Sequence, residues 1–153
     1  LALAAAYTID KTTVEFVFER TYWSSYKDLD FNYNIALGGF DAPIPKNWKD
    51  SNAYRIGVSH QYSDTLKLMA GFAIDKTPVP DSTLGFELPD SDAKLYSVGF
   101  EYKLSQNMKM GLSYLYDDKE SRTINQGVRL GKIKGEFTDS AAHLVTAALK
   151  YKF

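Results

Sequence analysis

The stretch "HLVTAALKYKF", residues 143–153, decides the fold class of this chain. Successive side chains of a β-strand point to opposite faces of the sheet, so the stretch sorts into two sets. The first set is mainly apolar and comprises His143, Val145, Ala147, Leu149, Tyr151 and Phe153. The second set is mixed and comprises Leu144, Thr146, Ala148, Lys150 and Lys152. A half-buried strand of a soluble sandwich has the same alternation, so the fold depends on whether the rest of the chain repeats it.

The same period of two recurs along the chain. Further alternating segments lie at 1–8, 14–22, 54–62, 66–75, 95–104 and 108–116. The apolar spacing of a helix does not occur in these segments. The sequence therefore predicts an all-β protein with about seven strands. The second strand is predicted to continue through a bulge near Ser24 and Ser25 as far as Asn34.

The connections between these segments alternate in length. Short turns are predicted around 9–12, 62–65 and 104–107, and long loops at 35–52, 76–92 and 117–140. Barrels of the bacterial outer membrane have short periplasmic turns and long extracellular loops. A soluble sandwich has no reason to sort its loops by length onto one end. The pattern therefore predicts an antiparallel transmembrane β-barrel in the bacterial outer membrane.

The two faces of the predicted sheet differ in composition. The apolar face carries Leu, Val, Ile and Phe, with tyrosines near the strand ends, where an aromatic girdle would lie: Tyr54, Tyr62, Tyr96, Tyr102, Tyr114 and Tyr116. The glycine-and-charge face mixes glycine and serine with Arg55, Lys67, Glu101 and Lys109. Unpaired charges are costly in a dry core, so we expect this face to enclose the lumen and the apolar face to contact outer-membrane lipid. A soluble barrel with the tyrosine-rich face inside is the alternative, because alternation does not identify the solvent of each face.

Composition excludes several other classes of protein. The formal net charge of -1 provides no basic field for nucleic acid. The absence of cysteine excludes disulfide scaffolds and thiolate metal sites. No carboxylate pair, Gly-rich phosphate loop or metal-ligand cluster has a readable spacing, and His60 and His143 fall on the apolar face. We therefore expect neither enzymatic activity nor a cofactor or metal.

The predicted topology leaves the barrel incomplete. If the turn at Asp10 is periplasmic, the first strand starts at the outer rim, while Phe153 ends on the periplasmic side. A complete single-chain bacterial barrel normally has an even strand number and both termini in the periplasm. We therefore expect residues 1–153 to be the C-terminal portion of one larger barrel domain. A missing N-terminal part would pair with both free edges. "LALAAAY" at 1–7 is interpreted as part of a strand rather than as a signal peptide.

The segment "AIDKTPVPDSTLGFELPDSDAKLYSVGFEY", residues 73–102, carries a family pattern. Asp75 is followed by Thr77-Pro78-Val79-Pro80-Asp81 and then by Leu88-Pro89-Asp90-Ser91-Asp92, which leads into a strand. This segment resembles the FadL-type long-chain fatty-acid and hydrocarbon transporters of bacterial outer membranes. Further matches at 20–29, 47–62 and 124–127 follow in the same order along most of the chain.

The resemblance implies a barrel of about fourteen strands with an N-terminal hatch in its lumen and a lateral opening in its wall. The hatch and the first half of the barrel are expected to be absent from this chain. The implied function is passive uptake of long-chain fatty acids or similar hydrophobic molecules. The alternative is a general porin or a structural outer-membrane barrel of another class; a porin would have an open aqueous lumen with charged rings.

A fatty acid needs an apolar slot for its tail and a cation for its carboxylate. The candidate cations are Lys46, Lys49 and Arg55. The resemblance implies a basic ligand-binding residue near Lys46. The alternative interpretation makes Lys46 and Lys49 solvated loop charges and pairs Arg55 with Glu101 or another lumen acid.

Three further features carry expectations. Prolines 78, 80 and 89 fix φ and lack a donor, so loop 76–92 is expected to be a rigid cap that either shapes the barrel mouth or contacts ligand. Leu149, Tyr151 and Phe153 resemble the C-terminal signature by which the barrel assembly machinery recognises its substrates. Trp23 and Trp48 are interpreted as interfacial anchors or as loop packing.

Overall fold

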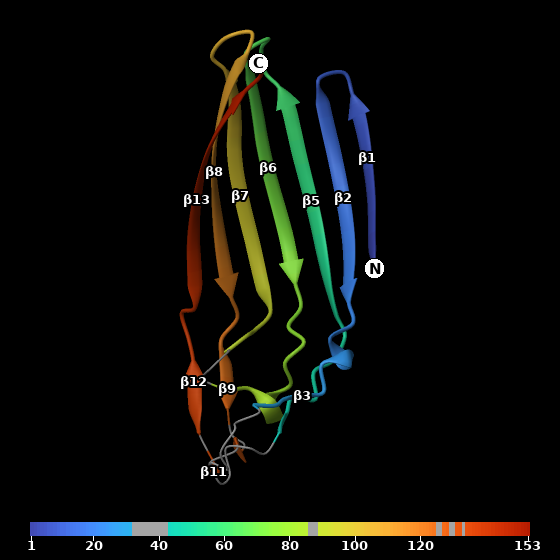
Figure 1. The fold of residues 1–153 in the computed structure, drawn as a ribbon, viewed down its shortest axis with the longest axis vertical. Coiled ribbons are helices and arrows are strands. Elements are labelled where there is room, and N and C mark those ends of the chain that lie inside the picture. The colour runs from blue at the N-terminus through green and yellow to red at the C-terminus, as the bar shows by residue number, and fades with distance from the viewer. Residues whose placement is uncertain (32–42, 86–88, 125–126, 129–130, 133) are drawn as a thin grey trace.

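A computed structural model describes residues 1–31, 43–85, 89–124, 127–128, 131–132 and 134–153. Its main element is a seven-stranded antiparallel sheet with the strand order β1-β2-β5-β6-β7-β8-β13 (Figure 1). The strands are β1 (Ala2–Ile9), β2 (Thr12–Thr21), β5 (Ser51–Gln61), β6 (Leu66–Asp75), β7 (Ala93–Lys103), β8 (Met108–Lys119) and β13 (Ala141–Tyr151). The prediction of an all-β chain with seven strands is confirmed.

The smaller elements gather at one end of the sheet, opposite the short turns (Figure 1). Strand β3 (Asp28–Leu29) pairs with β4 (Ile44–Pro45), β9 (Arg122–Ile124) with β12 (Gly135–Phe137), and β10 (Gly127–Val128) with β11 (Gly131–Lys132). Two 3-10 turns, η1 (Trp23–Ser25) and η3 (Asp81–Thr83), also lie in the long loops. Among the described residues, no helix is long and apolar enough to cross a membrane.

The second strand is shorter than the sequence suggested. Strand β2 ends at Thr21, and the chain then forms η1 instead of a bulged continuation. The Ser25 hydroxyl donates to the carbonyl of Tyr22 at 2.8 Å, and the Tyr26 amide donates to the carbonyl of Trp23 at 2.9 Å. Serine side chains that bond nearby backbone groups compete with strand pairing in this way. The rest of the predicted continuation, 32–34, lies outside the described residues.

The short turns follow directly from local chemistry. Asp10 has φ of 51°, in the left-handed region that Asp tolerates better than most residues. At the next short turn, the Ser63 hydroxyl oxygen accepts from the amides of Thr65 at 3.3 Å and Leu66 at 3.1 Å. Short turns at one end and long loops at the other agree with the predicted alternation.

The register places each side chain on its predicted face. One cross-strand row contains Ile56, Phe72, Tyr96, Tyr116 and His143, and the adjacent row contains Arg55, Ala73, Leu95 and Asp117. A hollow of about 640 Å³ lies over the glycine-and-charge face, where its lining includes Gly71, Gly99 and Lys67. Ile56 and Val98 on the apolar face are 50% and 57% exposed. The glycine-and-charge face is therefore the concave one, as predicted.

Gly99 permits close packing of neighbouring strands. A Cβ atom at this position would lie 3.0 Å from both the Leu112 carbonyl oxygen and the Ser113 Cβ atom. Such a distance is tighter than ordinary carbon contacts, so a side chain would push β7 away from β8.

The sheet is open, and its buried apolar core lies in the loops. Each edge strand, β1 and β13, has one neighbour among the described strands, and all of its residues are exposed. The buried cluster contains Val79, Leu84 and Ile124, with Trp48 and Phe137 packed against it. If the sheet spans a membrane, as the sequence predicts, its two edges would have to pair with further strands, because a membrane-spanning sheet cannot leave its edge groups in lipid.

Candidate ligand-binding site

A pocket of about 350 Å³ lies where the long loops meet the glycine-and-charge face. The loops contribute Trp23, Tyr26, Trp48, Lys76, Thr77, Pro78, Asp90 and Ser91, and the strand ends contribute Ser51, Asp75, Ala93, Leu95, Asp117 and Lys119. This volume is within the usual range for small-molecule pockets, about 300–1,000 Å³.

Three aromatic rings form one wall of the pocket. The Trp23 and Trp48 ring centroids are 5.3 Å apart at an interplanar angle of 70°, and those of Tyr26 and Trp48 are 5.2 Å apart at 78°. Edge-to-face contacts of this kind are favourable because the positive edge of one ring meets the negative face of another. The wall therefore offers a large, preformed apolar surface.

Asp50 anchors the turn that carries Trp23. Its carboxylate accepts from the amide of Ser24 at 3.1 Å and pairs with Arg20 at 3.2 Å. Hydrogen bonds from Ser24, helped by the charge of Arg20, lower the pKa of Asp50 below its usual value. The aromatic wall is thus tied to β2 and to the start of β5.

The opposite side of the pocket is polar. Asp75 and Asp117 lie on the glycine-and-charge face at the ends of their strands. Among the described residues, Asp117 Oδ1 and Trp48 Nε1 are the buried side-chain atoms without a hydrogen-bond partner. Buried unpaired polar atoms are uncommon in folded proteins. Both residues line the pocket, so the pocket contains a donor and an acceptor that a ligand could bind by hydrogen bonds.

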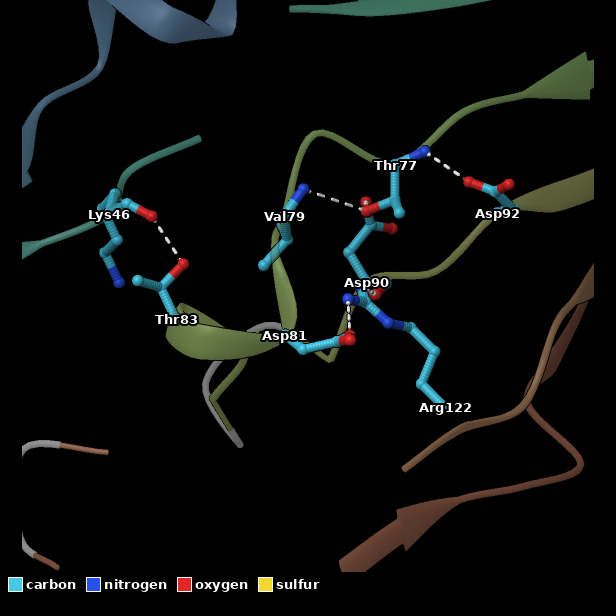
Figure 2. A network of polar contacts seen from close by, with 8 residues as sticks. All are labelled: Lys46, Thr77, Val79, Asp81, Thr83, Asp90, Asp92 and Arg122. Carbon is cyan, nitrogen blue, oxygen red and sulfur yellow. Dashed lines mark hydrogen bonds and ion pairs between the residues drawn. The ribbon is translucent and has the colours of Figure 1, made fainter. Parts of the chain in front are cut away.

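A polar network joins the two described ends of loop 76–92, 76–85 and 89–92, beside the pocket (Figure 2). The Thr77 hydroxyl donates to Asp90 at 2.6 Å, and the Thr77 amide donates to Asp92 at 2.9 Å. Asp92 also pairs with Lys76, and Asp90 pairs with Lys119 at 3.2 Å. The two ends of the loop are thereby held together beside β7 and β8.

Arg122 connects this network to the next long loop. Its guanidinium donates to the Asp90 carbonyl at 2.7 Å and pairs with Asp81 (Figure 2). The Arg122 side chain is only 14% exposed. Arginine suits this role because its planar fork donates in two directions at once.

The Lys76–Asp92 pair is shifted electrostatically in both partners. Burial favours the neutral form of Asp92, but hydrogen bonds from Lys76 and the Thr77 amide outweigh it, so the pKa of Asp92 is lowered. The hydrogen bond to Asp92 and its negative charge raise the pKa of Lys76. Both shifts favour the charged pair at neutral pH.

The predicted cations do not line this pocket. The Lys46 side chain is buried, its amide donates to the carbonyl of Lys27 at 2.8 Å, and its carbonyl accepts from the Thr83 hydroxyl. Lys49 is exposed, and its amide donates to the carbonyl of Pro78 at 2.9 Å. Arg55 pairs with Glu19 at 2.8 Å, whereas Glu101 pairs with Lys109. A ligand-binding role for these cations stays a prediction.

The loop motif is distributed between the pocket and the packing beneath it. Thr77, Pro78 and Asp90 line the pocket, and Val79 belongs to the buried cluster. Pro80 precedes η3, Asp81 pairs with Arg122, and Pro89 is exposed. Trp23 and Trp48 pack against each other, as the loop-packing interpretation predicted.

Sequence reasoning missed Tyr26, Asp75 and Asp117 as pocket residues. Their signal is positional, since each lies where a strand meets a long loop or within a few residues of that point. His60 and His143 lie on the apolar face and contact Thr12 and Tyr114 at 2.8 Å and 2.6 Å. Among the described residues, no group of three or more His, Asp or Glu side chains could hold a metal ion.

The C-terminal signature residues are exposed. Leu149 and Tyr151 lie on the apolar face of β13. The ring centroids of Tyr151 and Phe153 are 5.1 Å apart, in an edge-to-face arrangement. This arrangement leaves them accessible, and their recognition by the assembly machinery stays a prediction.

The chain is similar to known outer-membrane proteins over nearly its whole length. A family model described as "Outer membrane protein transport protein (OMPP1/FadL/TodX)" matches residues 4–153. "Outer membrane protein P1" of Haemophilus influenzae is 26% identical over 152 residues, covering 94% of this chain and 32% of that protein. The "47 kDa outer membrane protein" of Pasteurella multocida is 23% identical over 146 residues, with the same coverage of 94% and 32%.

A solved structure shows the same fold. The "Crystal structure of a Pseudomonas aeruginosa FadL homologue" superposes with a TM-score of 0.83 at 19% identity, covering 98% of this chain and 34% of that one. The chain therefore spans about a third of the length of the curated relatives and of the solved structure. Its seven strands have the fold of a segment of a larger antiparallel barrel.

Proposed function

The chain belongs to the outer membrane protein transport protein family (OMPP1/FadL/TodX) of the bacterial outer membrane, and from this premise we propose that it provides wall and loops for passive uptake of long-chain fatty acids or similar hydrophobic molecules. The observation that carries the proposal is the pocket that the long loops line, with its aromatic wall. Apolar and aromatic lining with a few convergent polar groups is typical of sites for small hydrophobic ligands.

Lys49 is the candidate cation that is both exposed and adjacent in sequence to the aromatic wall. Its exposed side chain follows Trp48, so a carboxylate bound there would leave the ligand tail beside the aromatic wall. Arg55 and Lys46 are proposed as weaker candidates, because Arg55 already pairs with Glu19 and the Lys46 side chain is buried. The proposal includes no catalytic step.

The proposal also names partners. Outer-membrane lipid would cover the apolar face, and the remaining part of the barrel would pair with the edges of β1 and β13. The barrel assembly machinery would recognise the strand that ends in Leu149, Tyr151 and Phe153.

The test is binding of hexadecanoic acid to the full-length protein that contains this chain, reconstituted in lipid nanodiscs. Trp23→Ala is expected to weaken binding about tenfold, which corresponds to about 1.4 kcal/mol. Tyr62→Ala is the matched control, because Tyr62 is an exposed aromatic residue that directly follows β5 at a short turn and does not line the pocket. Absence of binding together with an ion conductance would contradict the proposal and favour the general porin.

A further inference from the structure

Three lysines form one cross-strand row on the glycine-and-charge face. Lys103 of β7 pairs in register with Lys109 of β8, which pairs with Lys150 of β13. We call these three residues the lysine row. Like charges directly opposite one another destabilise a sheet, so the row is unfavourable unless an anion compensates it.

Among the described residues, Glu101 forms the ion pair of the lysine row. Glu101 pairs with Lys109 at 2.6 Å, and Lys109 lies between Lys103 and Lys150 in the row. Lys67 is the register partner of Glu101 on β6. Lys67 and the lysine row therefore lie around Glu101 at the short-turn end of the concave face, with more positive than negative charge in the described ion pairs and register.

The opposite end of the same face has the reverse charge. By register, the loop-side half of the seven strands carries Glu19, Asp75 and Asp117 on this face, against Arg55 and Lys119, and Glu15 lies near the middle of the face. Within the concave face itself, an anion is thus attracted more strongly at the short-turn end than at the loop-side strand ends. The attraction is stronger inside a closed lumen than in bulk water, because the effective dielectric constant there is lower.

The concave hollow lies between the two ends. Its lining includes Met69, Leu115 and Leu144, with the bare backbone of Gly71 and Gly99 between them, and Lys67 at its margin. A hydrocarbon chain can lie along such a surface while its head group reaches the lysine row. The hollow and the charge cluster are separate observations that meet at Lys67.

We propose that the lysine row is a second binding station, at the short-turn end of the lumen, for the carboxylate of the transported hydrophobic acid. The inference rests on the proposed function and specifies the ligand head group as an anion. Lysines that only contact solvent have no reason to lie directly opposite one another in one row. Glu101 compensates part of their positive charge, so the remaining positive charge can bind one further carboxylate.

The experiment uses hexadecanoic acid that carries a photoreactive diazirine beside its carboxyl carbon, and the corresponding alcohol. Each probe is cross-linked to the full-length protein in nanodiscs, and mass spectrometry maps the labelled peptides. The acid is expected to label the peptides around Lys103 and Lys109 about tenfold more than the alcohol does, as loss of one charge-assisted contact predicts. Raising the salt from about 0.1 M to about 1 M is expected to reduce this labelling, because the Debye length falls from about 10 Å to about 3 Å.

The variant K103Q/K109Q/K150Q is expected to lose this labelling about tenfold, and the corresponding arginine variant to retain it. The variant K11Q/K27Q/K134Q removes the same number of charges elsewhere and is expected to retain it. If the triple glutamine variant does not fold, as judged by heat-modifiable gel migration, the single K150Q variant at the exposed edge replaces it.

Equal labelling by acid and alcohol, or unchanged labelling of K103Q/K109Q/K150Q, would overturn the inference. A variant with lower thermal stability and unchanged labelling would also overturn it, since the lysines would then hold an acidic part of the protein itself. Labelling confined to the loop pocket would leave the proposed function intact while refuting the second station. Absence of labelling anywhere in the barrel would refute both.

Discussion

Leu84→Ala tests whether the long loops are held together by their own small core. Leu84 is fully buried and packs in the cluster with Val79 and Ile124. Truncating a buried leucine typically costs about 2–5 kcal/mol, because transfer free energy is lost and a cavity remains. A cost of about 2.8 kcal/mol would raise the population of opened loops about 100-fold.

Hydrogen exchange of the full-length protein in nanodiscs measures this opening. Exchange is expected to accelerate by a similar factor in peptides from 76–85 and 120–124, and to stay unchanged in β6, because the cluster lies outside the sheet. Leu3→Ala, at an exposed leucine on the apolar face of β1, is the matched control and should leave the loops protected. Unchanged exchange in the loops, or equal acceleration in β6, would refute the separate loop core.

Two further predictions concern the loop network and the strand packing. The pKa of Asp92 is lowered, so its contribution to stability is present above its unfolded-state pKa of about 3.9 and is lost as pH falls through the folded-state pKa. The pKa of Lys76 is raised, so its contribution is present below its unfolded-state pKa of about 10.4 and is lost as pH rises through the folded-state pKa. Resistance of loop 76–92 to protease is therefore expected to be constant between about pH 5 and pH 9 and to fall outside that window. The Asp92→Asn variant should be less resistant at neutral pH and should not lose further resistance when the pH is lowered. A wild-type protein that keeps its resistance at acidic pH would contradict this prediction. Gly99→Ala is expected to cost about 1–3 kcal/mol in thermal unfolding experiments, because its Cβ atom would lie 3.0 Å from Leu112 and Ser113, whereas Gly57→Ala, with its nearest atom at 3.9 Å, should be nearly neutral. Equal melting temperatures for the two glycine variants would show that the close approach of β7 and β8 is not limiting.

The faces of the sheet were predictable because they depend on a local property. Side-chain direction alternates along any strand, so the positions of Phe72 and Val98 follow from sequence once the strand is identified. The alternation of short and long connections then indicated that the long loops all lie at one end of the sheet. The direction of curvature followed from composition, since glycine and charge together suit a lumen better than a lipid contact.

The site depends on contacts that sequence cannot order. Arg55 was placed correctly on the glycine-and-charge face, but its partner is Glu19 on the adjacent strand, while Glu101 lies two strands away. The turn that carries Trp23 is held by Asp50, which lies twenty-seven positions after Trp23 in the chain. Trp23 and Asp117 of β8 both line the pocket. Alternation assigns a face to each residue and gives no information on which long loops fold over it.

The location of the buried residues separates the roles of wall and loops. Large apolar side chains on the wall, such as Val98 and Leu112, are exposed on the convex face, and we propose that outer-membrane lipid buries them. Leu84 and Ile124 in the loops are buried by the protein itself. The backbone ladder fixes the wall regardless of what the lumen contains, because its hydrogen bonds run between strands. Because the buried cluster lies in the loops and the seven-stranded ladder does not include it, an opening of the loops would not need to alter strand pairing.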